Sequence, residues 1–266
     1  MVRTERITPE VVRVVLGGED LADLRAVHAD SYVKLLFPPA GVVYDEPLDV
    51  AAIRESRPRT EWPVLRTYTV RAVDAERGEV TVDFVVHGDE GIAGPWAAAA
   101  RPGDEVHLMG PGGAYSPDPA APWHLLVGDA SALPAIAASL ERVPAGVPAV
   151  AVLQVHGPAE HQALPCPGEL RVHWLHGDGP DPEGLVALLR SLELPPGAPH
   201  AFLHGEADCV RAVRRWARTE LGVPRELLSA SGYWRRGRTE EGWREEKQDW
   251  AASVDSDDAV AAPSPA

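Results

Sequence analysis

RTYTVR, residues 66–71, is the stretch that decides how the first half of the chain is interpreted. It places two arginines, a tyrosine and two threonines in one short strand of a protein whose formal net charge is -15. On a regular strand Arg66 and Tyr68 point one way and Thr67 and Thr69 the other, because successive side chains alternate. An outward-facing guanidinium and phenol could hold a pyrophosphate and cover an aromatic ring, as a bound flavin requires. A polar strand with solvated arginines accounts for these six residues equally well.

Short β segments surround this stretch between about Val11 and Gly110. They are separated by Gly, Pro, Asp and Glu and read VVRVVL, SYVKLLF, LRTYTVRAV, EVTVDFVVH and DEVHLMG. Every second residue from Val80 to Val86 is apolar, which is the pattern of a strand with one face in a core. The sequence therefore predicts an antiparallel β-barrel in residues 1–115.

From residue 116 onward strands and helices alternate. The expected strands read WHLLVG, AVAVLQVH, RVHWLHG and HAFLHG, and the expected helices ASALPAIAASLERV, PEGLVALLRSL and ADCVRAVRRWARTEL. This alternation predicts a parallel sheet with helices on both faces over residues 116–250. Residues 251–266 are small, acidic and unpatterned, so we expect a disordered tail there.

Composition excludes several classes of protein. With 25 basic and 40 acidic residues the chain offers no broad nucleic-acid surface, which would need many phosphate contacts. No apolar run reaches the roughly 18 residues of a membrane span, and the N-terminus lacks the apolar core of a signal peptide. Cys166 and Cys209 match no zinc or iron–sulfur spacing, so no protein-bound metal is expected. We expect a cytoplasmic monomer.

The segment LLVGDASALPAI is a candidate nucleotide-binding turn. Open α/β sheets bind ligands beyond the carboxyl ends of their strands, often with a phosphate at a helix N-terminus. Here Gly128 and Asp129 follow a strand and Ser131 precedes a helix. The G-x-G-x-x-G pattern is missing, and an ordinary turn with Ser131 as N-cap is the alternative.

Two further segments bear on function. DFVVHGDEGIAGPW places His87 after a strand and then a glycine-rich bend that enters a helix, where backbone N–H groups can meet phosphate. SASGYWRRGRTEEGWREEKQDW gathers Tyr233, Trp234 and other aromatics among arginines and is interrupted by glycines. Either an amphipathic C-terminal helix or a lid on a cleft would explain it, and we expect the lid.

Taken in order, these segments resemble the siderophore-interacting proteins, FAD-dependent ferric-siderophore reductases of the ferredoxin-reductase superfamily. The resemblance runs from about Thr4 to Trp250. It is carried by RITPEVVRVVLGGEDL, DSYVKLLFP, RTYTVR, DFVVHG, AGPWA, PGDEVHLMGPGG, LLVGDASALPAIAASLE, GEADCVRAVRRW and SGYWRRGRTEEGW. It implies a six-stranded antiparallel FAD-binding β-barrel followed by an NAD(P)H-binding α/β domain with a C-terminal lid segment.

The resemblance also assigns roles to residues of this chain. The implied flavin-binding residues are Arg66, Thr67, Tyr68, Thr69, Asp83, Phe84, Val85, His87, Gly88, Ala93, Gly94, Pro95 and Trp96. The implied nicotinamide-binding residues are Gly128, Asp129, Ser131, Ala132, Gly205 and Glu206, with Tyr233 or Trp234 shielding the flavin or nicotinamide. No catalytic side chain is expected.

Electron donor and acceptor follow from the same resemblance. The family pattern leads us to expect an acidic residue and then WLHR, whereas this chain has Gln154 and HWLHGDG, so Gly177 replaces an arginine that could meet the 2′-phosphate of NADPH. NADPH and NADH both stay open as donors, and ferredoxin is a third. The acceptor is a ferric siderophore, an anionic chelate. The basic residues expected to line its approach are Lys34, Arg235, Arg236, Arg244 and Lys247. A general flavin or ferredoxin-type reductase and a non-catalytic ferric-siderophore carrier are the alternatives.

Overall fold

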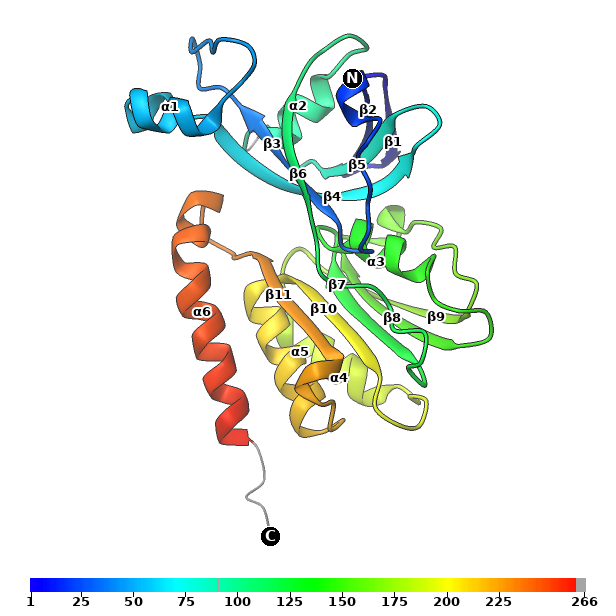
Figure 1. Ribbon diagram of the computed structural model, residues 1–266. Coiled ribbons are helices and arrows are strands. Elements are labelled where there is room, and N and C mark those ends of the chain that lie inside the picture. Colours follow the sequence, from blue (N-terminus) through cyan, green and yellow to red (C-terminus); the bar gives the residue numbers. More distant parts are fainter. Residues whose placement is uncertain (90, 262–266) are drawn as a thin grey trace. The chain divides into compact units, whose positions relative to one another are not determined.

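The protein consists of two compact units, Met1–Ala114 and Tyr115–Ala266 (Figure 1). The computed structural model describes residues 1–89 and 91–261. Each unit has its own sheet and its own core, and each is described by itself below.

The first unit is a six-stranded antiparallel sheet with the order β1-β2-β5-β4-β3-β6. Its strands are β1 (Arg3–Thr8), β2 (Val11–Gly17), β3 (Tyr32–Phe37), β4 (Val64–Asp74), β5 (Glu79–Val85) and β6 (His107–Gly112). Its helices are α1 (Val50–Ser56), which lies between β3 and β4 in the chain, and α2 (Ala93–Ala99), which follows β5. The predicted antiparallel six-stranded class is confirmed, with β1 and β6 at the ends of the sheet.

One core holds this sheet together. Val33 and Leu35 of β3 and Val82 and Phe84 of β5 are buried in the same cluster as residues of β2, β4 and α2. Burying each such side chain contributes about 1.5–3 kcal/mol. The alternation seen in the sequence of β5 therefore does select the face that packs.

The second unit is a five-stranded parallel sheet with the order β11-β10-β7-β8-β9. Its strands are β7 (His124–Asp129), β8 (Pro148–Val155), β9 (Glu169–His176), β10 (His200–Glu206) and β11 (Leu228–Trp234). Its helices are α3 (Leu133–Leu140), α4 (Pro182–Ser191), α5 (Ala207–Thr219) and α6 (Glu240–Ala261). The chain leaves β7 toward β8 and β9 and later returns to β10 on the other side, so the strand order reverses beside β7.

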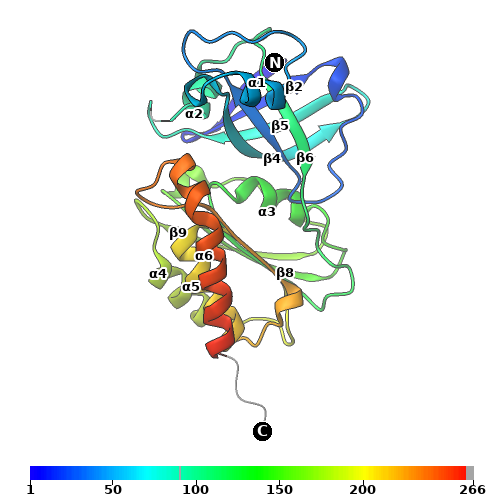
Figure 2. The same cartoon turned by 60° about the vertical axis from the view of Figure 1, so that its left-hand side comes forward.

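Helices cover both faces of this parallel sheet, as predicted (Figure 2). Buried residues of α3 pack with one set of strand side chains, and buried residues of α4 and α5 pack with the opposite set. Because both faces are covered, β7 and β8 are almost continuously apolar, which is typical of parallel strands.

The C-terminal segment differs from the expected lid. Residues Leu228–Trp234 form the edge strand β11, parallel to β10, so Tyr233 and Trp234 belong to the sheet. The sequence LSASGYW did not predict a strand because it contains none of the β-branched residues that are typical of strands.

The expected disordered tail is also wrong over the described residues, since α6 continues to Ala261. Trp243, Trp250 and Val254 recur at helical spacing and are buried against Ala207 and Val210 of α5 and the neighbouring strand. The small and acidic residues between these three positions resemble a tail in composition, but they occupy the solvent side of a helix. Residues 262–266, the rest of the predicted tail, lie outside the described residues.

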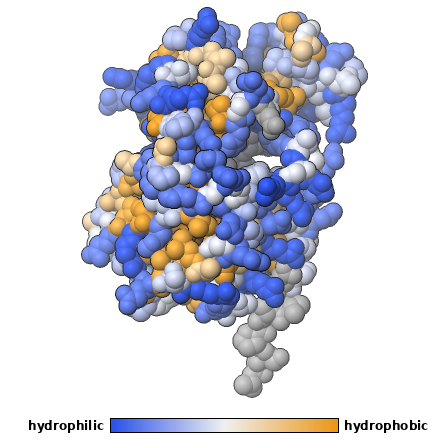
Figure 3. All heavy atoms as spheres, turned by 180° about the vertical axis from the view of Figure 1, so that it is seen from behind, coloured by the Kyte–Doolittle hydropathy of each residue, from blue (hydrophilic) through white to orange (hydrophobic). Residues whose placement is uncertain are grey.

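On the face drawn in Figure 3 hydrophilic residues predominate, and apolar residues are visible in separate patches. Among the described residues, no helix combines the length and the apolar character needed to cross a membrane.

Candidate flavin and nicotinamide sites

The arginine and tyrosine of RTYTVR lie on one face of β4, as the alternation predicts, but that face is not the outward one. Arg66 and Tyr68 stand opposite Leu35 and Val33 of β3, which are both buried in the core. The Tyr68 ring packs on Phe84, with ring centroids 4.3 Å apart. Both side chains remain half-buried rather than covered. An aromatic ring backed by a second ring and flanked by a guanidinium is a rigid platform for a planar aromatic ligand.

Two other expected flavin residues already have structural tasks. Asp83 is buried and forms a bidentate pair with Arg13, with N–O distances of 2.7 and 2.8 Å. Trp96 packs edge-on against Phe37 and tilted against Phe84, with centroids 5.7 Å apart in both pairs. Sequence reasoning missed the Arg13 pairing because the two residues are 70 positions apart.

The glycine-rich bend brings its backbone close to the end of β5. A Cβ at Gly94 would lie 3.2 Å from the Val85 carbonyl oxygen, so only glycine lets the chain pass here without displacing its neighbour. Gly88 has a φ of 56°, which favours glycine. His87 is largely exposed, with Nδ1 3.9 Å from a Glu10 carboxylate oxygen. Among the described residues no side chain caps α2, and because Pro95 has no N–H and the Trp96 N–H donates to the Ile92 carbonyl, only Ala93 and Gly94 could offer first-turn amides to an anion.

In the second unit Asp129 organises the carboxyl end of the sheet. Its Oδ1 accepts from the backbone N–H and the hydroxyl of Ser131, at 2.9 and 2.5 Å. Its Oδ2 accepts from the Glu206 backbone N–H and the Trp234 indole, both at 2.8 Å. Ser131 is therefore not the N-cap of α3: that position is Ala132, and no side chain of the described residues caps the helix. The backbone N–H groups at the start of α3 are therefore not taken by a side-chain cap within the described residues.

Glu206, at the end of β10, also accepts hydrogen bonds from the backbone of neighbouring loops. One of its carboxylate oxygens caps α5 through the N–H groups of Asp208 and Cys209, and the other accepts from the Arg236 N–H. Asp129 and Glu206 therefore tie three loops, those after β7, β10 and β11, to one another.

Close backbone approach explains the two glycines of this edge. A Cβ at Gly128 would lie 2.6 Å from the His204 carbonyl oxygen, and one at Gly205, whose φ is 140°, would lie 2.8 Å from the Asp129 carboxylate. A side chain at either position would therefore push the turns after β7 and β10 apart.

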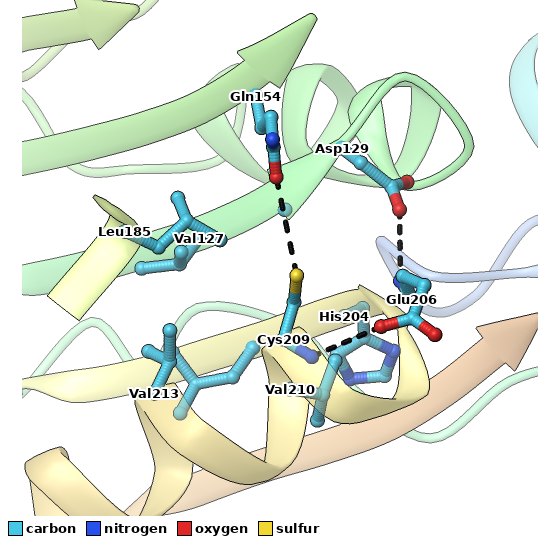
Figure 4. A pocket seen from close by; sticks show the side chains of 11 residues that line it. Val127, Asp129, Gln154, Leu185, His204, Glu206, Cys209, Val210 and Val213 are labelled. Atoms are coloured by element: carbon cyan, nitrogen blue, oxygen red, sulfur yellow. Dashed lines mark hydrogen bonds between the residues drawn. The ribbon is translucent and has the colours of Figure 1, made fainter. Parts of the chain in front are cut away.

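A small pocket lies beneath this edge, between β7, β10 and α5 (Figure 4). Gln154, His204 and Cys209 line it together with Asp129, Glu206 and apolar side chains. Burial lowers the pKa of His204 to about 3, with a smaller contribution from Lys247, so this ring is neutral at physiological pH. Burial and the nearby carboxylates raise the pKa of the Cys209 thiol, which makes it an unreactive filler.

Gln154 is the residue of this region that sequence reasoning undervalued. Its amide nitrogen donates to the Gly179 carbonyl at 2.6 Å, and its oxygen accepts from the Asp181 N–H at 3.3 Å. It thereby anchors the loop between β9 and α4. The signal that could have identified it is its place at the end of β8, where a polar side chain closes an otherwise apolar strand.

The basic residues expected around the acceptor do not form one cluster of uncompensated charge. Arg235 lies 3.8 Å from Asp208 and 3.4 Å from Glu246, and Arg244 lies 3.1 Å from Glu240. Burial lowers the pKa of Lys247. Lys34 is exposed on β3 of the first unit, opposite Thr67. Arg236 is exposed at the strand ends of the second unit. Their contact with a chelate stays a prediction.

Family domains match both units of the chain. The siderophore-interacting FAD-binding domain matches residues 1–115, and the siderophore-interacting protein domain matches residues 121–237. Ferric vibriobactin reductase ViuB of Vibrio cholerae is 35% identical over 92% of each chain. An NADPH-dependent ferric-chelate reductase of Escherichia coli is 30% identical, over 88% of this chain and 91% of its own. The crystal structure of the siderophore-interacting protein SipS from Aeromonas hydrophila is similar with a TM-score of 0.80, at 30% identity over 94% of this chain and 96% of that one.

An antiparallel unit that matches an FAD-binding domain, followed by a parallel α/β unit, has the ferredoxin-reductase-like fold of FAD- and NAD-binding proteins. The chain belongs to the siderophore-interacting protein family, whose two domains match residues 1–115 and 121–237, most of its length.

Proposed function

We propose that the protein is an FAD-dependent reductase that passes electrons from NADPH or NADH to ferric siderophores and so releases Fe(II) in the cytoplasm. The observation that carries this proposal is the Arg66–Tyr68 platform in one unit and the uncapped start of α3 beside Gly128 in the other. These two features suit the two nucleotides that such a reaction needs. Two relatives named as ferric reductases support the choice of acceptor.

Each nucleotide has its own residues in this proposal. Arg66 supplies positive charge to the FAD pyrophosphate, and Tyr68, braced by Phe84, covers the flavin ring. Gly128, Ser131 and the first turn of α3 receive the nicotinamide cofactor, while Asp129 and Glu206 keep the loops around it in place. Bound FAD supplies the chemistry that this chain lacks, because it takes a hydride as an electron pair and yields electrons singly.

The acceptor needs no metal ligand from the protein. Fe(III) is a hard cation held by siderophore oxygens, and reduction to Fe(II) weakens that hold. The chain has to admit an anionic chelate to the flavin edge, for which Lys34, exposed on β3 of the first unit, is a candidate. Attraction between exposed charges decays over about 8 Å at physiological salt.

Anaerobic stopped-flow spectroscopy of the FAD-loaded protein tests the proposal. NADPH or NADH should bleach the flavin absorbance, and a ferric siderophore added afterwards should restore it while an Fe(II) chelator develops colour. Higher salt should slow the step with an anionic ferric siderophore and leave a neutral ferric chelate nearly unaffected. If reduced ferredoxin bleaches the flavin and neither NADPH nor NADH does, the assignment of a nicotinamide as electron donor is wrong. If free flavin restores the absorbance and no ferric chelate does, the assignment of a ferric siderophore as acceptor is wrong.

A further inference from the structure

Arg236 is unusual among the arginines of the C-terminal segment. Arg235, Arg238 and Arg244 all form ion pairs with carboxylates, whereas Arg236 forms none within the described part of the chain. Its side chain is nevertheless in place: its guanidinium atoms lie 3.4 to 3.7 Å from where a Cβ of Gly179 would stand. An arginine kept unpaired in a chain with 40 acidic residues indicates a partner that comes from outside.

The position of this guanidinium is set by two contacts. The Arg236 backbone N–H donates to Glu206 at 3.1 Å, which fixes the main chain beside the end of β10. The side chain reaches Gly179 in the loop after β9, and the amide of Gln154 holds that loop at 2.6 Å. Arg236 therefore joins the β10–α5 connection to the β9–α4 loop across the carboxyl edge of the sheet.

That edge is where a dinucleotide would place its adenosine. In doubly wound sheets a ligand binds at the strand order reversal, the pyrophosphate lies at the first helix, and the residue at the end of the second strand discriminates at the ribose. An acidic residue there accepts a hydrogen bond from a free 2′-hydroxyl, whereas an arginine nearby binds a 2′-phosphate. The reversal lies beside β7, α3 is the first helix, and the second strand is β8, which ends at Gln154 and Val155.

The charges at this edge favour phosphate. Gln154 is neutral where an acid would repel a phosphate. The carboxylates close by are engaged, since Glu206 caps α5 and Asp181 caps α4 through the Gly184 N–H. The Asp178 side chain is 92% exposed and lies 3.5 Å from the ring of His156, so solvent screens its charge. Arg236 is left as the cation with a free guanidinium face.

We propose that Arg236 binds the adenosine 2′-phosphate of NADPH and makes this chain prefer NADPH to NADH, with Gln154 as the positioning residue. This inference rests on the proposed nicotinamide site. Arg236 would supply the positive charge for the 2′-phosphate that Gly177, which stands where the family pattern has an arginine, cannot supply.

Calorimetric titration with 2′,5′-ADP and with 5′-AMP tests the inference without turnover. The two probes share adenosine and the 5′-phosphate and differ only in the 2′-phosphate. In the FAD-loaded wild-type chain 2′,5′-ADP should bind more tightly, and Arg236→Gln should weaken it about tenfold to a hundredfold while changing 5′-AMP binding less than about twofold. Arg236→Lys should keep part of the preference for 2′,5′-ADP over 5′-AMP, because lysine retains the positive charge but lacks the planar guanidinium that can bind a phosphate through two hydrogen bonds. The matched control is Arg238→Gln, two positions along and paired with Glu246, which should bind both probes as the wild type does.

The outcomes separate this inference from the proposed function. Equal binding of the two probes by the wild type, or equal loss of both in Arg236→Gln, would show that Arg236 does not recognise the 2′-phosphate. Failure of the wild type to bind either probe would overturn the nicotinamide site itself.

Discussion

Trp234 and Asp129 lie 105 positions apart and are joined by a 2.8 Å hydrogen bond from the indole Nε1 to Oδ2. The bond crosses β10 and ties the end of the edge strand β11 to the turn after β7. It completes the set of four donors on Asp129, while the Trp234 ring stays 39% exposed. An aromatic surface is thus held rigidly at the strand ends, where a nicotinamide would lie.

Removing this bond should destabilise the second unit in a graded way. Trp234→Phe keeps the ring and loses the donor, which should lower the free energy of unfolding by about 1 kcal/mol. Asp129→Asn should cost more, about 2–3 kcal/mol, because an amide cannot accept from all four donors. Denaturant titration of both variants would check the order. A larger loss in Trp234→Phe than in Asp129→Asn would show that Asp129 is not the organising residue.

Replacing Arg66 should weaken FAD binding. Arg66→Ala leaves a phosphate underpaired, at a cost of about 1.5–3 kcal/mol, or roughly one to two decades in affinity. Quenching of flavin fluorescence during titration of the apoprotein measures it. Arg71→Ala, on the same strand, is the control and should bind FAD as the wild type does. Unchanged affinity in Arg66→Ala would remove this arginine from the site.

The sequence predicted the architecture well where the hydrophobic pattern is strong. Regular alternation in β5 and the apolar runs of β7 and β8 were enough to assign both sheets. It failed at β11 and α6, whose burial comes from partners far along the chain. Arg214 of α5 shows the same effect: it is largely buried, and its partner Asp255, at 2.7 Å, comes from α6, 41 positions along the chain.

The candidate site residues also differ in whether the sequence alone could predict them. The local motif after a recognisable strand pointed to Asp129 and Ser131, and the family resemblance pointed to Glu206. Hydrogen bonds over long sequence separations, such as that from Gln154 to Gly179, leave no local pattern and became visible only in the structure. The outward face assigned to Arg66 and Tyr68 was wrong because alternation defines two faces without saying which one is covered.

Acid should destabilise the protein through its buried histidines. Burial and neighbouring His200 lower the pKa of His124 to about 4, below its ordinary value of 6.5, and neither of its ring nitrogens has a hydrogen-bond partner among the described residues. The unfolded chain therefore takes up this proton more readily, so the contribution to stability is complete above about pH 6.5 and is lost as the pH falls toward 4. His204 extends the same trend to lower pH.

Unfolding free energies measured between pH 4 and pH 7 would test this dependence. His124→Leu deletes the titrating group without removing a hydrogen bond, so its curve should be flatter than that of the wild type. Curves of equal slope would show that His124 does not contribute to the acid sensitivity.

The final turns of α6 should be needed for stability although their composition resembles a tail. Val254 is 2% exposed and packs with Trp243 and Trp250, and Asp255 lies 2.7 Å from both Arg214 and Arg225. Val254→Ala should cost about 1–3 kcal/mol through lost burial and the cavity left behind. Ending the chain at Trp250 should cost more, because it also leaves the largely buried Arg214 without this partner.

Thermal and denaturant unfolding of both variants would measure these losses, with Ser253→Ala as a control on the same turn. FAD binding should persist in all three variants, since the Arg66–Tyr68 platform belongs to the other unit. A truncated chain as stable as the full one would mean that α6 beyond Trp250 packs too weakly to matter, as the composition alone had suggested.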